Sequence, residues 1–185
     1  MATSGQAVAV DPLLRDKLAA GSLAGQWALD PARSTVRLRS RSLWGLAPIT
    51  GSFGNVAGEG VVSATGEASG TVTVDAASID TKMKKRDVHL RSADFFDSDV
   101  HPHIAVTVER LTLTADGATA IGTLQVRDRT QPLTFPVAVS VAGDSAVQLD
   151  AEVVIDRSDF GITWNQLGMA STKSTITVRA VFTQL

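Results

Sequence analysis

The chain has 185 residues, the length of one domain or of one domain with an extension. Hydrophobic residues make up 44% of it and charged residues 19%, which supports a packed core and excludes a disordered chain. The net charge of −2 provides no overall basic field for nucleic acid, and the lack of cysteine excludes thiol catalysis, disulfide bonds and cysteine-bound zinc.

Residues 1–25 are predicted to form an N-terminal extension that contains a short helix over residues 11–20. Asp11 is suited to cap this helix, Pro12 to occupy its first turn and Gly21 to end it. The extension has neither a basic start nor a sustained apolar stretch, so it is not interpreted as a secretory signal. The chain contains no apolar run of about 18 residues that could span a membrane. We therefore expect a cytoplasmic protein without a transmembrane segment.

Residues 26–185 are predicted to form an all-β domain, because apolar and polar residues alternate from Trp27 onward. In one such segment, Val36 and Leu38 occupy one face while Arg37 and Arg39 occupy the other. Strict alternation indicates strands with one buried face and one wet face. About eight such segments, separated by glycine-rich turns, indicate an antiparallel sandwich or barrel. The alternation alone does not decide between the two.

A second short helix is predicted over residues 81–92, with Thr81 as its cap and with Met83 and Leu90 on one face. Five basic residues gather in the same stretch: Lys82, Lys84, Lys85, Arg86 and Arg91. They could attract a phosphate group or an anionic lipid surface. A run of charge is more often a solvated helix face, and we adopt that interpretation.

All three histidines, His89, His101 and His103, lie in one window of the sequence. On an extended strand, His101 and His103 would point to the same side and could chelate zinc, with His89 as a third ligand. The alternative is that His101 and Pro102 mark the entry to a strand, where polar residues are common. The sequence has no calcium-binding loop, nucleophilic serine elbow or phosphate-binding glycine loop. A metal-dependent hydrolase is kept as a less favoured alternative.

The stretch from Val74 to Ile104 is similar to the signature of the YceI-like polyisoprenoid-binding family. The matching positions are Ser78, Ile79, Thr81, Arg86, Asp87, His89, Leu90, Phe95, Phe96, Asp97 and Pro102. Further matches are "WALDPARSTV", "ITGSFGNVAGEG", "GTLQVRDRTQPLTFPV" and "IDRSDFGI". The resemblance covers about residues 26–183.

This resemblance implies an extended, lipocalin-like antiparallel barrel of about eight strands, with a helical excursion after the fourth. It implies non-catalytic binding or transport of an elongated apolar ligand, such as a polyisoprenoid, an isoprenoid quinone or a similar lipid. No cofactor is implied beyond such a bound lipid, and the resemblance suggests a homodimer. The family pattern has a histidine at His89 and no fixed one at His101 or His103, so it implies no metal site.

In a small barrel, the inward face forms both the core and the wall of any ligand cavity. The predicted tunnel lining is therefore drawn from large apolar residues: Trp44, Phe53, Phe95, Phe96, Phe160, Trp164 and Met169. The resemblance gives the motif residues a structural or rim role: Arg86, Asp87, His89 and Leu90. The charged members would hold the excursion by charge-assisted hydrogen bonds, while Phe95 and Phe96 insert into the barrel. The alternative is a structural or stress-response scaffold whose barrel is filled by its own side chains. A continuous apolar tunnel would favour ligand binding over that alternative.

Overall fold

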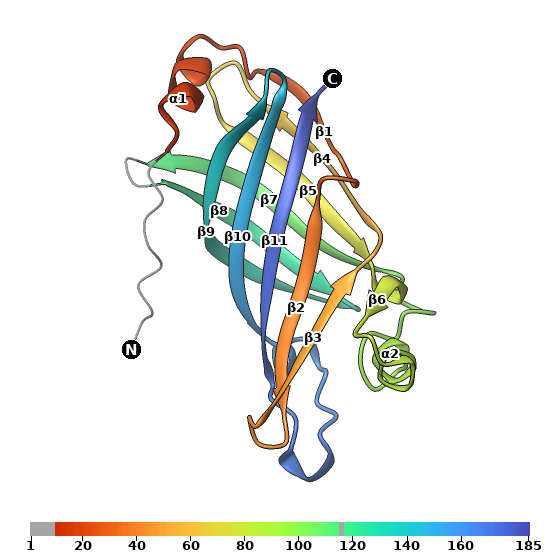
Figure 1. Ribbon diagram of the computed structural model, residues 1–185. Helices are drawn as coiled ribbons and strands as arrows, with labels where there is room; N and C mark the ends of the chain where they lie inside the picture. Colours follow the sequence, from red (N-terminus) through yellow and green to blue (C-terminus); the bar gives the residue numbers. More distant parts are fainter. Residues whose placement is uncertain (1–9, 115–116) are drawn as a thin grey trace.

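The structure is a computed structural model that describes residues 10–114 and 117–185. Residues 1–9 of the predicted extension and residues 115–116 of a predicted hairpin turn lie outside the described residues. The described chain is built mainly from antiparallel strand segments, as Figure 1 shows. The segments are β1 (Gly25–Leu29), β2 (Thr35–Ser42), β3 (Ala47–Phe53), β4 (Val56–Val62), β5 (Ala68–Asp75), β6 (Ile79–Asp80), β7 (His103–Thr114), β8 (Gly117–Val126), β9 (Arg129–Gly143), β10 (Ala146–Asp156) and β11 (Lys173–Gln184).

The segments close into a barrel of eight antiparallel strands, because β11 returns to pair with β1. β1 and β2 lie end to end along β11, where Leu29 pairs with Phe182 and Thr35 pairs with Arg179. β4 and β3 continue one another in the same way, since β4 pairs with β1 and β3 pairs with β2. β5 and β6 do so as well, since β5 pairs with β4 and β6 pairs with β3. Interrupted strands therefore explain why more segments than strands are present. The all-β fold and the eight-stranded barrel are confirmed.

Ser34 bridges the interruption between β1 and β2. Its buried hydroxyl donates to the carbonyl of Asp30 at 2.7 Å and accepts from the backbone N–H of Val181 at 3.0 Å. A side chain thus supplies the partner that the interrupted backbone does not offer to β11. The chain can change direction at this point without leaving a buried backbone group of Val181 unpaired.

Helix α1 (Pro12–Ala19) covers one end of the barrel, the upper end in Figure 1. Asp11 caps it by accepting from the N–H of Leu13 at 3.0 Å, and Gly21 follows it with a φ of 68°. The predicted helix and its capping signals are confirmed. Leu14 is only 2% exposed because it packs into the barrel core, so the helix is docked on the barrel. The division of the chain into two units at residue 25 stays a prediction.

Helix α2 (Lys84–Arg91) lies outside the barrel wall next to β6 and confirms the predicted excursion. Two details of the prediction were wrong. Met83, not Thr81, is the N-cap residue, and it is 54% exposed, so it shares no buried face with Leu90. The excursion also follows the third strand of the barrel rather than the fourth, because the six segments before it form three interrupted strands. Three single-turn 3-10 helices complete the described structure: η1 (Ala76–Ser78), η2 (Arg157–Phe160) and η3 (Gln166–Gly168).

Candidate ligand-binding cavity

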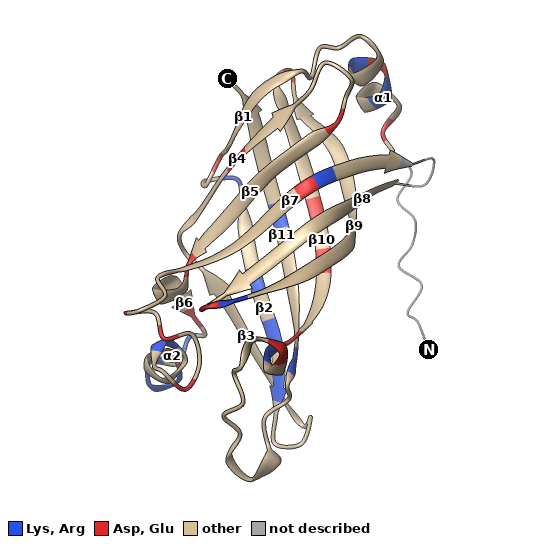
Figure 2. Cartoon of the chain, turned by 180° about the vertical axis from the view of Figure 1, so that it is seen from behind, with Lys and Arg blue, Asp and Glu red and all other residues tan. Residues whose placement is uncertain are grey.

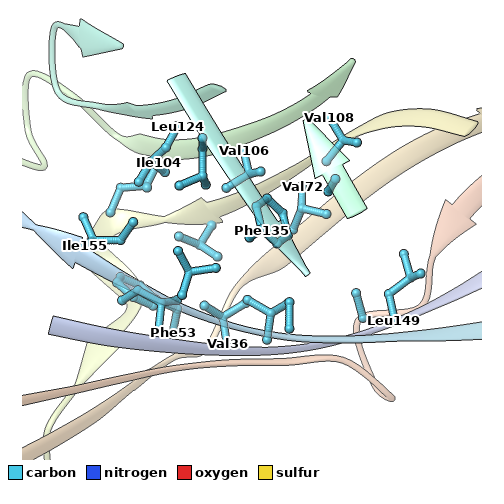
Figure 3. Close-up of a pocket in the computed structure, with 18 of the residues that line it drawn as sticks. Val36, Phe53, Val72, Ile104, Val106, Val108, Leu124, Phe135, Leu149 and Ile155 are labelled. Carbon is cyan, nitrogen blue, oxygen red and sulfur yellow. The ribbon is translucent and has the colours of Figure 1, made fainter. Parts of the chain in front are cut away.

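The barrel encloses a cavity of about 520 Å³. This volume lies within the range of pockets that hold small-molecule ligands, roughly 300–1,000 Å³. The close-up in Figure 3 shows aliphatic and aromatic side chains pointing into it from opposite walls. The lining side chains labelled there are Val36, Phe53, Val72, Ile104, Val106, Val108, Leu124, Phe135, Leu149 and Ile155.

Many inward-facing apolar side chains are only half-buried, which shows that the interior is hollow. Val72 and Val106 pair across β5 and β7 and face the cavity, yet both keep partial exposure. Leu149 and Ile176 on β10 and β11 do the same. In a filled interior such residues would be packed on all sides. The inward-facing apolar residues of the strands therefore form the wall of a cavity and not a solid core.

The two ends of the cavity differ in chemistry. Beneath α1, the lining is apolar and includes Leu14, Leu18 and Leu23. At the opposite end, β2, the segment before β11 and the start of β11 contribute hydroxyl side chains: Ser40, Ser42, Ser171 and Ser174. The cavity therefore offers an apolar end and a polar end to anything that enters it.

Five of the seven predicted tunnel residues line this cavity: Phe53, Phe95, Phe96, Phe160 and Trp164. The other two, Trp44 and Met169, are not among its lining residues. Trp44 is 69% exposed on the hairpin between β2 and β3, and its backbone N–H donates to the backbone carbonyl of Met169 at 3.1 Å. The two residues therefore meet beyond the end of the barrel. The ligand contact of each predicted residue stays a prediction.

Sequence reasoning missed three aromatic residues that line the cavity, Trp27, Phe135 and Phe182. It selected large apolar residues by their type, whereas the alternation in β1, β9 and β11 already places these three on inward positions. Trp27 is 4% exposed, and its Nε1 donates to the carbonyl of Leu23 at 3.0 Å. The two-residue alternation of side chains along a strand would have identified these three residues as inward-facing.

An aromatic cluster lies near the polar end of the cavity and contains Phe95, Trp164 and His89. The ring of His89 lies edge-on to Trp164 at 4.5 Å and to Phe95 at 5.1 Å between centroids. The guanidinium carbon of Arg157 lies 5.6 Å from the centroid of Phe95. Edge-to-face packing and a cation over a ring are both favourable arrangements. Separately, Phe96 packs edge-on against Phe53 at 6.0 Å.

The guanidinium of Arg157 lies beside this cluster, and one of its nitrogen donors has no hydrogen-bond partner among the described residues. Its Nε donates to the carbonyl of Ser171 at 3.1 Å and its Nη1 to that of Ile162 at 2.8 Å. Its buried Nη2 has no hydrogen-bond partner among the described residues. Burial lowers the pKa of Arg157, although the neighbouring Asp156 opposes the shift. An arginine stays charged in proteins, so a donor remains available beside the cavity.

Asp156 stays ionised next to this arginine. The hydroxyl and the backbone N–H of Ser158 donate to its carboxylate and hold the pKa of Asp156 below its usual value. Thr172 donates to the same carboxylate at 3.1 Å. The region around Arg157 is therefore held by hydrogen bonds from η2 and from the residue that precedes β11.

The charged motif residues converge on Thr81. Asp87, which is 7% exposed, accepts from the backbone N–H of Thr81 at 2.9 Å and from its hydroxyl. Arg86 donates from Nε to the Thr81 hydroxyl at 2.8 Å and from Nη2 to its carbonyl at 2.9 Å. His89 instead contacts Asp94 at 3.0 Å. These contacts tie α2 to the segment before it and place Arg86, His89 and Leu90 on the cavity wall.

The histidine window does not assemble a metal site in the described part of the chain. No group of three or more histidine, aspartate or glutamate side chains there is arranged to hold a metal ion. His103 is the first residue of β7 and pairs with Asp75, while His89 lies in the aromatic cluster.

A comparison with protein families decides the affiliation of the chain. The YceI-like domain matches residues 27–182. The chain belongs to the YceI-like family. The resemblance noted from the motif residues is thereby confirmed.

A UPF0312 protein of Staphylococcus aureus strain MSSA476 is 30% identical to this chain over 148 residues, which are 76% of this chain and 84% of that protein.

Solved structures share the barrel of this YceI-like chain. BcnA of Burkholderia cenocepacia superposes with a TM-score of 0.75 and 21% identity, covering 83% of this chain and 98% of that one. A polyisoprenoid binding domain from Saccharophagus degradans has a TM-score of 0.69 and 16% identity, covering 86% and 98%. These matches support the fold. Among the helices of the described residues, none is long and apolar enough to cross a membrane.

Proposed function

We propose that the chain binds one elongated apolar molecule inside its barrel and performs no chemistry on it. The observation that carries this proposal is the cavity of about 520 Å³ with its almost wholly apolar wall. Each methylene that leaves water for such a wall gains about 0.8 kcal/mol, so a long chain binds without many polar contacts. A polyisoprenoid, an isoprenoid quinone or a similar lipid fits this chemistry. The similarity to a polyisoprenoid binding domain supports the same class of ligand.

The ligand should carry a hydrogen-bond acceptor at one end. The unpartnered Nη2 of Arg157 lies at the polar end of the cavity, where serine hydroxyls also line the wall. A carbonyl or phosphate oxygen placed there would satisfy this donor, and the apolar tail would extend toward α1. This orientation favours a quinone or a polyprenyl compound with an oxygenated end over a plain hydrocarbon.

Replacing Arg157 by Met should lower affinity for a long-chain quinone about tenfold to a hundredfold, as the loss of one charged hydrogen bond predicts. The affinity of the variant for a linear isoprenoid hydrocarbon without oxygen should stay near that of the parent. Retained binding of this hydrocarbon would also show that the barrel is intact. Arg179→Met is the matched control, because Arg179 pairs with Asp150 on the outer face. Equal loss for both ligands would contradict a head-group role for Arg157.

Binding should change tryptophan fluorescence, and the change should come from the residues on the cavity wall. Trp164 and Trp27 line the cavity, whereas Trp44 is exposed and lies apart from it. Titration with a polyprenol or a long-chain quinone should give a saturable change that Trp164→Phe diminishes and Trp44→Phe leaves intact. A change that disappears only with Trp44→Phe would place the ligand elsewhere. Mass spectrometry of an organic extract of the purified protein would identify a ligand acquired in the cell.

The hollow interior supports a binding protein over a barrel filled by its own side chains. Two further expectations from the sequence, a cytoplasmic location and a homodimer, stay predictions. Sedimentation analysis of the purified chain would measure the second, and fractionation of cells that express the full-length protein would measure the first.

A further inference from the structure

The end of the barrel away from α1 presents large apolar side chains to solvent. Leu43, Trp44 and Leu46 on the hairpin between β2 and β3 are 48%, 69% and 84% exposed, and Leu167 in η3 is 79% exposed. Both loops form the lower end of the molecule in Figure 1, and the hydrogen bond from Trp44 to Met169 joins them. These four residues are called the apolar tip below. Apolar groups gathered in this way usually mark an interaction site.

The composition and backbone of both loops set them apart from ordinary solvent-facing turns. Residues 42–50 and 160–172 contain no lysine, arginine, aspartate or glutamate. Leu43, Trp44 and Leu167 have φ values of 50°, 53° and 56°, a region that large side chains rarely adopt. Glycine or asparagine would relieve this strain in a turn that only faces water. Strained backbone of this kind tends to occur at functional sites.

A row of arginines leads to the apolar tip along the outer face of β2. Arg37, Arg39 and Arg41 are exposed, and they form no ion pair within residues 10–114 and 117–185. Their cross-strand neighbours are uncharged on both sides: Ser52, Thr50 and Pro48 on β3, and Thr177 and Thr175 on β11. Figure 2 shows the blue stretch on the lower part of β2. The nearby Lys173 is left out of this row, because Asp156 pairs with it in register.

We propose that the apolar tip and the three arginines dock the protein on an anionic lipid bilayer. Tryptophan and leucine side chains suit the boundary between headgroups and acyl chains, and arginines beside them suit anionic headgroups. The net charge of −2 would otherwise keep the chain away from such a surface, so the local row of arginines is what selects it. We favour a bilayer over a protein partner, because the apolar tip is flanked by arginines and neither of its loops contains an acidic residue.

Docking in this orientation brings the polar end of the cavity to the membrane. Ser40, Ser42 and Ser171, which line that end, come from the same two segments that carry the apolar tip. A lipid could then move between bilayer and barrel without its tail crossing water. Docking itself requires no ligand, whereas this transfer rests on the proposed function.

The experiment is flotation of the full chain with vesicles of phosphatidylcholine alone and of phosphatidylcholine with an equal part of phosphatidylglycerol. We expect binding to the anionic vesicles, weakened by added salt, and little binding to the neutral ones. Arg37→Gln with Arg39→Gln should lower the partition coefficient roughly 25-fold, about fivefold for each charge. Trp44→Ser with Leu46→Ser should lower it at least about tenfold by removing apolar insertion.

Matched controls separate this surface from general effects. Lys84→Gln with Lys85→Gln removes two charges from exposed positions on α2, and Val154→Ser removes a 62% exposed apolar residue from β10. Both should bind like the parent. Val106→Trp, which fills the cavity, should also float normally, so failure of ligand binding and failure of docking are distinguishable. Absence of parent binding to anionic vesicles, or equal losses in the control variants, would overturn the proposal.

Discussion

Replacing Val106 by Trp should reduce affinity for an elongated apolar ligand at least about a hundredfold. Val106 points into the middle of the cavity from β7, opposite the side chains of β10, as Figure 3 shows. An indole at this position would exclude several carbon atoms of a bound chain. Losing four buried methylenes, at about 0.8 kcal/mol each, already exceeds two powers of ten in the dissociation constant.

The same substitution should leave the barrel folded, because the indole would enter empty space instead of a packed core. We expect the free energy of unfolding to change by less than about 2 kcal/mol, measured by urea denaturation. Thr107→Trp is the matched control, since Thr107 is exposed on the opposite face of the same strand. A Val106→Trp variant that binds a polyprenol or quinone like the parent would place the ligand outside the barrel.

The strands could be predicted from the sequence because alternation follows directly from the geometry of a pleated strand. Val36 and Leu38 face inward and Arg37 and Arg39 face outward, as the alternation requires. Closure of the barrel did not follow from alternation, since it depends on the pairing of Trp27 with Gln184 at the two ends of the domain. Closure into a barrel was predicted only from the resemblance to the YceI-like family.

The interruptions in the first three strands had no local signal. Ser34 fills one of them through hydrogen bonds to Asp30 and to the distant Val181, and no short sequence window contains both partners. The number of strands that precede α2 could not be predicted for the same reason, because it depends on which segments continue one another. Long-range pairing, and not propensity, fixes these features.

The residues of the candidate site could be predicted only in part, because the direction of each side chain depends on the local backbone. Phe53 on β3 and Phe95 in the motif segment line the cavity, and so does Trp164 in the segment between η2 and η3. Trp44 has the same chemistry but lies in a turn beyond the end of β2, where a positive φ directs the chain away from the barrel. Aromatic character predicts burial only where the backbone points the side chain inward. Trp44 therefore belongs to the apolar tip and not to the cavity wall.

Replacing Asp87 by Ala should lower the free energy of unfolding by about 3 kcal/mol. The Asp87 carboxylate accepts both the backbone N–H and the hydroxyl of Thr81, and both residues are buried, at 7% and 4% exposure. Alanine would leave these donors without a partner and would remove the negative charge of the residue that follows Arg86 on the same helix. Asp87→Asn keeps an acceptor for one donor and should cost less. Urea denaturation of the parent and of both variants measures the series.

The control for this substitution is Asp94→Ala, because the Asp94 side chain is 52% exposed and its contact with His89 lies near the surface. An exposed contact of this kind contributes at most about 1 kcal/mol, so this variant should unfold close to the parent. The Asp87→Ala variant should also bind ligand more weakly under conditions where it is folded, since α2 places His89 and Leu90 on the cavity wall. If Asp87→Ala and Asp94→Ala unfold at the same urea concentration as the parent, the contacts around Thr81 do not anchor the helix. Weaker binding with unchanged stability would instead assign Asp87 to the cavity rim, because the helix would then be held by Arg91, whose Nη2 donates to the carbonyl of Ile79 at 3.0 Å.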